Sequence, residues 1–419
     1  MKKAVLLIIP VFAFCISFKE ALRSVEDSLI LKSAKELQKA SEFAYEAQKG
    51  KLYPSLDLSL DIARLQETPT VRFMNMKLPM GDKNRFEGEI SIKYPIFSGF
   101  AISSLVDEAK LRKEIAKLKV SDLKRELILK ISYIYSSALS LKEKQKALEE
   151  AKKAVSLSYK KALGLYKNGL LPISEVYNIR AKKFDIQSQI AQTESEKKKL
   201  LNSLSYILDR EVKGVEEIGK SVKLLKKEEA IRSALENRAD LKSLRKLLKI
   251  DQKEIELAKS AFYPFVSAAV GLKRRGKDLS LNGDGYTNAN ENYAALRFSW
   301  NLFKGFSDKN GLEAARAKKI ASFFKLKDYE KRVVKEIKDA FSDIEALEAK
   351  IKSAQEEVKA REEYYKLTYG RFENKFASAD ELSRAISDLA ASKAKFWALK
   401  NELFYQTVKV RLLGAKKIF

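Results

Sequence analysis

Two stretches of strict polar–apolar alternation between Tyr53 and Phe97 constrain the fold of this chain more than any other feature. The first alternates apolar with polar residues: Leu56, Leu58, Leu60 and Ile62 with Ser55, Asp57, Ser59 and Asp61. The second does the same: Phe86, Ile90, Ile92 and Tyr94 with Glu87, Glu89, Ser91 and Lys93. Successive side chains of a strand point to opposite faces. Residues 53–97 are therefore predicted to form an antiparallel hairpin with one apolar and one polar face.

This hairpin has two interpretations. Two strands alone bury too little surface to be stable, so the apolar face must be covered. The hairpin either packs on a helix as an ordinary two-faced sheet, or belongs to a lipid-facing barrel with an apolar outside and a polar inside. The hairpin alone favours neither interpretation, and the rest of the chain has to decide between them.

The chain is internally duplicated. Tyr53-Pro54 recurs 210 residues later as Tyr263-Pro264, and Phe97-Ser98-Gly99-Phe100 recurs 206 residues later as Phe303-Lys304-Gly305-Phe306. A second hairpin is therefore predicted, with a shorter tip, since surface loops tolerate changes in length. The expected segments are a first structural repeat over 18–210 with its hairpin at 53–97, a linker over 211–227, a second repeat over 228–414 with its hairpin at 263–303, and a tail over 415–419.

Each repeat is predicted to contain a helix, the hairpin, a very long helix, a turn and a last helix. The first helix is expected from about Lys19 to Gly50, and the first very long helix from about Ala101 to Lys167. In the latter, residues such as Leu127, Ile134 and Val155 recur at steps of seven, which indicates coiled-coil packing. A helix of about 66 residues is roughly 100 Å long, too long for a globular core. The helices are therefore expected to form the wall of a tube or a filament.

Composition narrows the classes of function. The chain has 82 Lys and Arg against 56 Asp and Glu, which gives a net charge of +26, and it has no histidine. Such a charge can indicate nucleic acid or an anionic surface, but the lysines interleave with glutamates along helices and no aromatic-rich basic patch stands out. We expect solvated helix faces and no nucleic-acid partner. Without histidine, a nucleophile setting or a phosphate-binding glycine loop, the chain is expected not to be an enzyme and to need no cofactor.

The N-terminus has the pattern of a secretory signal peptide over residues 1–17. Lys2 and Lys3 precede an apolar run from Ala4 to Phe18, which is too short to span a bilayer. Cleavage is expected near Ser17. Lipidation of Cys15 is the alternative, and Phe14 disfavours it because such sites require a small residue at that position.

Four strands per chain cannot close a barrel, and open sheet edges are not tolerated in lipid. The barrel interpretation therefore requires several copies, and three copies would supply twelve strands. The polar faces would then line the lumen with charged residues: Asp57, Asp61, Glu87, Glu89, Lys93, Lys273 and Arg297. Aromatic residues at the helix-proximal ends of the strands would form an interfacial girdle: Tyr53, Tyr94, Tyr263 and Trp300.

Over essentially its whole length the chain resembles the TolC family of outer-membrane efflux proteins. The resemblance rests on the repeated Tyr-Pro at strand entry, the Phe-x-Gly strand-to-helix junctions and the turn sequence Tyr166-Lys-Asn-Gly169-Leu170-Leu-Pro-Ile-Ser174-Glu175-Val176. It implies a homotrimer, internally duplicated, with a twelve-stranded transmembrane β-barrel in the outer membrane and an α-helical barrel that forms a tunnel in the periplasm. It also implies outer-membrane lipid, a periplasmic adaptor (membrane fusion protein) and an inner-membrane transporter as partners.

The resemblance also assigns roles to the two helix turns, at residues 168–174 and 374–380. The tips that bind the adaptor would comprise Asn168, Gly169, Leu170, Asn374, Lys375 and Phe376; lysine at 375 departs from the glycine usual in the family. The periplasmic gate would comprise Ser174, Glu175, Glu381 and Arg384. The expected partners of Ser174 and Glu175 are here Phe372 and Ala377, which lack a hydroxyl and a charge. Ser378 and Glu381 also have the spacing of a capping box, which explains Glu381 without a gate.

Several alternatives remain open from the sequence. Export of small molecules and type I protein secretion share this architecture, and the frequency of efflux in the family favours the former. A structural alternative is a secreted coiled-coil scaffold whose hairpins pack on helices. Met74, Met76 and Met80 lie in the first hairpin loop, and thioethers favour Cu(I), but plain apolar surface is the preferred interpretation and no metal site is predicted.

Overall fold

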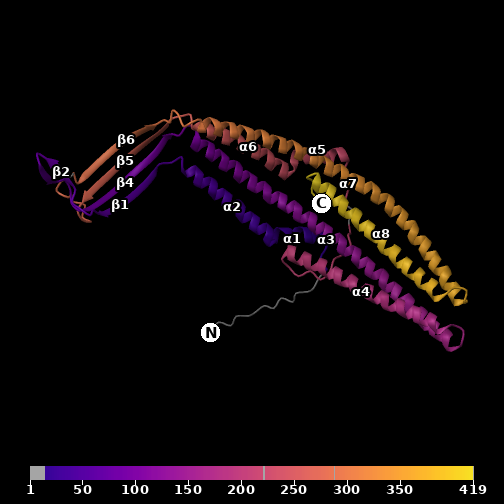
Figure 1. Ribbon diagram of the computed structural model, residues 1–419. Helices are drawn as coiled ribbons and strands as arrows, with labels where there is room; N and C mark the ends of the chain where they lie inside the picture. The colour runs from indigo at the N-terminus through magenta and orange to yellow at the C-terminus, as the bar shows by residue number, and fades with distance from the viewer. Residues whose placement is uncertain (1–14, 220–221, 287, 419) are drawn as a thin grey trace, which may run out of the picture. The chain divides into compact units, whose positions relative to one another are not determined.

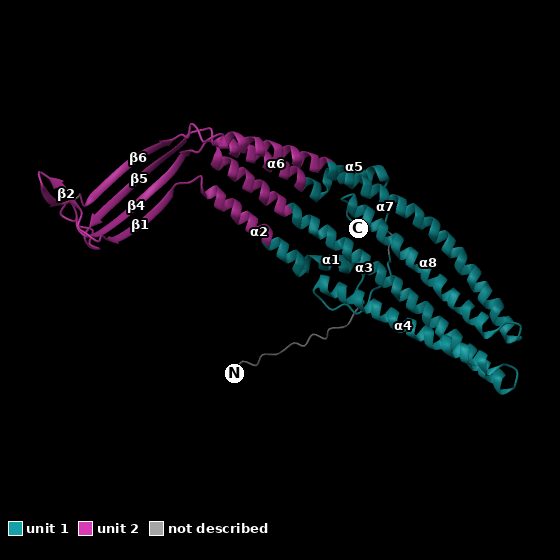
Figure 2. Cartoon of the chain, in the orientation of Figure 1, with its two compact units in different colours: residues 1–36, 118–242, 328–419 teal, residues 37–117, 243–327 magenta. Residues whose placement is uncertain are grey.

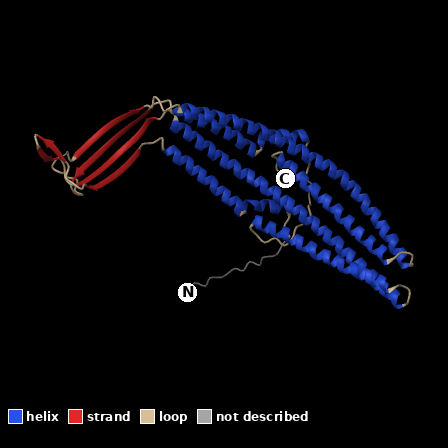
Figure 3. Ribbon diagram, viewed as in Figure 1, coloured by secondary structure: helices blue, strands red, loops and turns tan. Residues whose placement is uncertain are grey.

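The computed structural model describes residues 15–219, 222–286 and 288–418. It divides into two compact units, unit 1 with residues 1–36, 118–242 and 328–419 and unit 2 with residues 37–117 and 243–327 (Figure 2). Unit 1 is helical, whereas unit 2 holds all the strands of a four-stranded sheet and the adjoining ends of four helices (Figure 3). The predicted mixture of mainly α with β structure is confirmed.

The sheet of unit 2 confirms both predicted hairpins. It consists of β1 (Ser55–Arg64), β4 (Asn84–Phe97), β5 (Phe265–Gly276) and β6 (Asn290–Ser299), in the order β1-β4-β5-β6 and antiparallel throughout (Figure 1). The two repeats join where β4 pairs with β5. A short hairpin of β2 (Thr70–Phe73) and β3 (Met76–Pro79) occupies the first loop. This short hairpin was not predicted from the sequence.

The first very long helix has the predicted extent, and the second repeat contains its counterpart. They are α3 (Ala101–Lys167) and α7 (Ser307–Glu373), each of 67 residues. Residues at the seven-residue steps of α3, such as Leu127, Leu148 and Val155, are buried. The last helices of the repeats are α4 (Ile173–Leu208) and α8 (Ala379–Leu413). None of the helices in these ranges combines the length and apolar content that a membrane-spanning helix requires.

The prediction of one unbroken helix from about Lys19 to Gly50 is wrong. The segment contains α1 (Phe18–Ser24), a 3₁₀ turn η1 (Val25–Asp27) and α2 (Leu29–Gly50). The second repeat has the same interruption, between α5 (Lys227–Asn237) and α6 (Ala239–Ser260). The two interrupting residues, Ser28 and Arg238, lie 210 positions apart and have extended backbones, with ψ of 133° and 130°. Both are buried, so the duplication preserves the interruption.

The last residues of the predicted leader over residues 1–17 make contacts within the fold. Residues 1–14 of that leader lie outside the described ranges, but Ile16 and Ser17 belong to the fold. Ile16 is 2% exposed, and its backbone pairs with the segment around Val215, within the predicted linker over 211–227. The hydroxyl of Tyr135 donates to the Ile16 carbonyl at 3.0 Å, and Ser17 accepts a hydrogen bond from the Glu20 amide as the N-cap of α1.

Unit 1 contains two apolar cores. The first gathers side chains from α1, α3, α4 and α8, among them Phe18, Tyr135 and Leu204. The second lies toward the helix turns and gathers Val155, Ile179 and other residues of α3, α4, α7 and α8. Apolar burial on both sides of each turn fixes the positions of the turn residues.

Candidate functional site

The sheet of unit 2 separates polar from apolar side chains. Residues directly opposite each other in an antiparallel pair share a face, and the register pairs Asp57 with Ser91 and Glu87 with Arg275. It also pairs Ser267 with Arg297. All seven residues predicted to line a lumen therefore lie on one face: Asp57, Asp61, Glu87, Glu89, Lys93, Lys273 and Arg297.

Several of the charges on this polar face are paired across strands. Lys93 contacts Asp57 at 3.2 Å, and Glu87 accepts contacts from both Lys273 and Arg275. The hydroxyl of Tyr293 donates to Glu89. Paired carboxylates and cations on one sheet face suit a surface in contact with water.

The opposite face of the sheet is apolar and exposed. It carries leucine, isoleucine and valine at consecutive paired positions, for example Leu58, Ile90 and Leu272. Leu58 is 78% exposed and Leu296 is 70% exposed. Exposed apolar surface of this extent marks an interaction surface, and its alternation with a charged face is the pattern of a lipid-facing barrel.

The four predicted girdle aromatics are exposed at the ends of the strands that adjoin the helices. Tyr53 and Tyr263 lie two residues before the starts of β1 and β5, Tyr94 lies in β4 opposite Ala268, and Trp300 follows β6. The indole N–H of Trp300 donates to the carbonyl of Phe262 at 3.2 Å. Aromatic side chains with a polar group are enriched at membrane–water interfaces.

The two helix turns of unit 1 have the same backbone structure. At the first, Leu170 N–H donates to the Leu165 carbonyl and Gly169 N–H to the Tyr166 carbonyl, both at 2.9 Å. At the second, Phe376 N–H donates to the Arg371 carbonyl at 2.8 Å and Lys375 N–H to the Phe372 carbonyl at 3.1 Å. This pair of bonds is a Schellman motif, which ends a helix with one left-handed residue.

Equivalent residues of the two turns occupy equivalent places. Gly169 and Lys375 are the left-handed residues, with φ of 70° and 65°. The side chains of Asn168 and Asn374 each donate to the carbonyl four residues earlier, at 2.9 Å. Leu170 and Phe376 are 50% and 76% exposed, so each tip presents an apolar side chain at this position. The structure thus brings the six predicted tip residues into two matching turns.

Glu175 connects the two turns. Its carboxylate accepts a hydrogen bond from the backbone N–H of Ala379, at the start of α8, at 2.8 Å. Phe372, one of the residues expected to face Ser174 and Glu175, makes an apolar contact instead of a polar one. It is 1% exposed and packs in the second core with Val176 and Ile179. The contact between the turns is therefore made by a carboxylate and a helix N-terminus, without a hydroxyl or charge at 372 and 377.

Each of the other two predicted gate residues has an ion-pair partner. Ser378 accepts a hydrogen bond from the Glu381 amide, which confirms the cap, and the Glu381 carboxylate contacts Arg371 at 3.0 Å. Arg371 also donates to the carbonyl of Phe376, and Arg384 contacts Asp380 at 2.8 Å. Arg371 was not among the residues predicted from the sequence. The i,i+4 spacing of Asp380 and Arg384 was the available signal for the second pair.

These features coincide with those of one protein family. The model of the outer membrane efflux protein family matches residues 24–209 and 230–413, one match in each repeat. The chain therefore belongs to the outer membrane efflux protein family. A comparison with curated protein sequences found no match.

Solved channel structures share the fold. The outer membrane protein VceC from Vibrio cholerae is 15% identical with a TM-score of 0.81, and 96% of this chain and 97% of that chain are covered. The Campylobacter jejuni CmeC outer membrane channel is 16% identical with a TM-score of 0.82, over 95% and 86% of the two chains. The Neisseria gonorrhoeae MtrE channel, solved in its open state, is 12% identical with a TM-score of 0.74, over 95% and 88%.

Family membership places the protein in the outer membrane, with its helical part in the periplasm. The family consists of channels rather than enzymes, in agreement with the prediction of no catalytic activity. The scaffold alternative, in which the hairpins pack on helices, is therefore not supported.

Proposed function

We propose that three copies of this chain form one export channel, with a twelve-stranded barrel in the outer membrane and a helical tunnel through the periplasm. The channel releases small molecules that an inner-membrane transporter delivers through a periplasmic adaptor. It is passive, because nothing in the family or in the described site supplies energy.

The observation that carries this proposal is the four-stranded sheet with an exposed apolar face and a charge-paired opposite face. Within the described residues, β1 and β6 pair on one side only, so the sheet has two open edges. Lipid tolerates no open edge, and three copies related by rotation would pair each β1 with the β6 of a neighbour. The seven charged residues would then line the lumen, and the four aromatics would form the girdle.

The exported cargo is tested in cells that lack their own channel of this family. Expression of the chain with a matching adaptor and transporter should lower the steady-state accumulation of a fluorescent small-molecule dye. A variant that lacks residues 168–174 controls for expression. If dye accumulation does not change while a protein substrate of a type I transporter appears in the medium, the channel serves protein secretion instead.

The matching turns support a second part of the proposal. Leu170 and Phe376 provide the apolar contacts for adaptor hairpins, and the turns of three copies would surround the periplasmic mouth. Ser174, Glu175, Glu381 and Arg384 would lie at this mouth. Because Arg371 pairs with Glu381, and Asp380 with Arg384, we propose a mouth with little net charge and weak ion selectivity.

Two substitutions with opposite effects test this arrangement. Arg371→Gln releases the Glu381 carboxylate and should shift the reversal potential in a KCl gradient toward cation selectivity. Glu381→Gln releases the Arg371 guanidinium and should shift it toward anion selectivity. The measurement is the reversal potential in planar bilayers. Unchanged reversal potentials for both variants would show that Glu381 and Arg371 do not line the mouth.

A further inference from the structure

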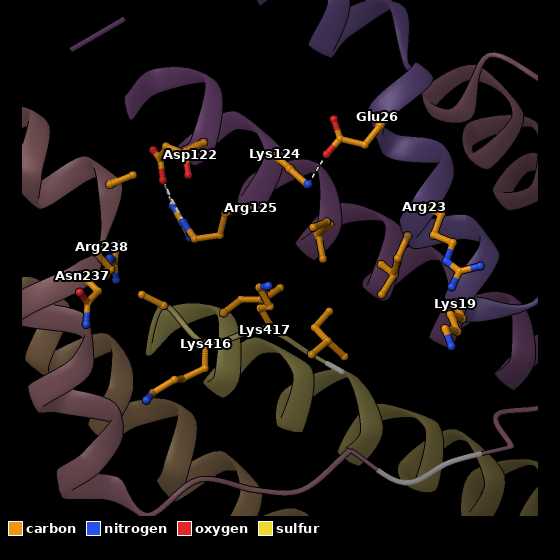
Figure 4. A pocket seen from close by; sticks show the side chains of 17 residues that line it. Lys19, Arg23, Glu26, Asp122, Lys124, Arg125, Asn237, Arg238, Lys416 and Lys417 are labelled. Atoms are coloured by element: carbon orange, nitrogen blue, oxygen red, sulfur yellow. Dashed lines mark hydrogen bonds and ion pairs between the residues drawn. The ribbon is translucent and has the colours of Figure 1, made fainter. Parts of the chain in front are cut away.

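Unit 1 contains a cleft that the channel proposal does not use. It has a volume of about 650 Å³ and is formed by α1, α3, the junction between α5 and α6, and the segment that follows α8 (Figure 4). Small-molecule sites in proteins have volumes of about 300–1,000 Å³. We call it the basic cleft, because seven of its lining residues are lysine or arginine and only two are acidic.

The two carboxylates of the basic cleft are already paired. Glu26 contacts Lys124 and also Lys35, and Asp122 contacts Arg125 at 2.7 Å; Figure 4 shows the Lys124 and Arg125 pairs as dashed lines. Arg238 contacts Asp240 at 2.6 Å behind the cleft wall. Three of the seven cations are therefore neutralised by residues of the fold.

Of the remaining four cations, Lys416 alone has an ion-pair partner among the described residues. No ion pair among the described residues involves Lys19, Arg23 or Lys417, and Lys416 approaches Glu229 only to 3.6 Å. All four residues are exposed. They line the cleft from two separate segments, α1 and the stretch after α8, which the fold brings to the same cleft.

The positive charge of Lys19 is in an unfavourable position within its own helix. It lies in the first turn of α1, where the helix dipole disfavours a cation. It is also four residues before Arg23 on the same helix, and like charges at this spacing repel. A bound anion between α1 and the segment after α8 would offset both unfavourable terms.

The rest of the wall determines which kind of anion fits. Leu22, Ile128, Leu412 and Ile418 line the same cleft. We propose that the basic cleft binds an amphiphilic anion: a small molecule with a sulfonate, phosphate or carboxylate group held by Lys19, Arg23 and Lys417, and an apolar body against these four side chains. This site is separate from the strands and the turns, and does not depend on the channel proposal.

The test uses 2-naphthalenesulfonate as the probe and the purified full-length chain in detergent, with isothermal titration calorimetry. We expect saturable binding at one site per chain that weakens as salt is added, because salt screens exposed charges. The uncharged control 2-naphthol has the same ring system and should bind at least about tenfold more weakly, since hydrogen bonds to charged groups are the stronger ones.

The double variant Arg23→Gln/Lys417→Gln should lower the affinity for the sulfonate at least about tenfold. Because both side chains are exposed, the variant should keep its fold, which circular dichroism verifies. The matched control is Lys335→Gln, on α7 and outside the cleft, with a side chain 75% exposed; its affinity should equal that of the unmodified chain. The absence of saturable sulfonate binding, equal affinity for both probes, or an unaffected double variant would overturn the proposal.

Discussion

At the residue scale, the two tips differ at the position that sets the turn. Gly169 and Lys375 have nearly the same φ and the same hydrogen bonds, yet only glycine adopts this conformation without a penalty. The left-handed conformation costs other residues about 1–2 kcal/mol. The second tip is therefore strained where the first is relaxed, although both have the same shape.

Lys375→Gly should stabilise the second tip by about 1 kcal/mol. The measurement is hydrogen exchange of the tip amides, which should slow about fivefold, because exchange reports local opening. Gly169→Ala should have the opposite effect at the first tip. Gly164→Ala is the control, since it lies within α3 with nothing near its added methyl group and should stabilise the helix slightly. Unchanged exchange in Lys375→Gly would contradict the strain.

A buried group of charges follows the interruption between α5 and α6. Arg238 contacts Asp240 at 2.6 Å and Glu336 at 3.2 Å, and the hydroxyl of Tyr329 donates to Asp240 at 2.8 Å. The Arg238 side chain is 3% exposed. Burial opposes its charge, but the contacts with Asp240 and Glu336 raise its pKa. Burial likewise favours a neutral Asp240, yet the hydrogen bond with Arg238 lowers the pKa of that carboxyl.

Asp240→Asn should reduce the free energy of unfolding by about 3 kcal/mol, the lower end of the cost of breaking a buried ion pair, because Arg238 loses its closer carboxylate and keeps Glu336. The midpoint of urea denaturation measures this change. Asp339→Asn, in an exposed pair with Lys335, should stay within about 0.5 kcal/mol of the unmodified chain. Equal effects of the two substitutions would show that the buried pair contributes no more than an exposed one.

The same cluster of charged residues makes the stability of the protein depend on pH. The pKa of Asp240 is lowered in the folded state. Its contribution to the free energy of unfolding is therefore complete above pH 3.8, the pKa of the unfolded chain, and is lost as the pH falls below that value. Burial and the hydrogen bond to Asp240 raise the pKa of Tyr329 from 10.0 to about 12. The contribution of Tyr329 is complete below pH 10 and is lost as the pH rises toward 12. Tyr329→Phe should reduce the alkaline loss of stability and keep the acidic one, whereas the alkaline loss from other buried tyrosines with a raised pKa, such as Tyr135, should remain.

At the scale of the elements, the faces of the strands give the sharpest prediction. Leu58 and Ser59 are neighbours in β1, but lie on the apolar and polar faces respectively. Leu58→Arg should cost about 2–4 kcal/mol if its face contacts lipid. Ser59→Arg should be tolerated in a lumen. The measurement is the amount of folded protein in the outer-membrane fraction, and equal amounts for both variants would contradict the assignment of the faces.

Much of the element structure could be predicted from the sequence because it depends on periodicity. Alternation with a period of two locates β1 and β4, and the seven-residue steps through Leu127 and Val155 locate the core side of α3. The interruptions at Ser28 and Arg238 could not be predicted, because neither residue is a helix breaker and each is buried by tertiary contacts. The β2–β3 hairpin was not predicted either, since Met74, which has a φ of 44°, is not one of the usual residues of a tight hairpin turn.

The candidate site also has features that could be predicted from the sequence and features that could not. Alternation places all seven charged residues on one face of the sheet without any structural information. The duplication likewise predicts that Leu170 and Phe376 are equivalent. The pairing of Arg371 with Glu381 and the bond from Ala379 to Glu175 depend on how the chain turns between helices. Such contacts connect residues across a turn or across repeats, where sequence spacing carries no signal.

At the scale of the whole molecule, a single chain is incomplete. Its sheet has an exposed apolar face and, in the ranges that the structure describes, two edges that pair on one side only. Twelve strands from three copies would remove every edge and leave an aqueous lumen. Assembly into a trimer is therefore the central physical requirement of the proposed function, ahead of the identity of the cargo.

The most direct measurement is single-channel conductance in a planar bilayer on protein purified from membranes, together with its native mass in detergent. We predict a mass of three chains and discrete conductance steps. A monomer or dimer without conductance would show that the strands do not close a barrel, and would contradict the channel proposal.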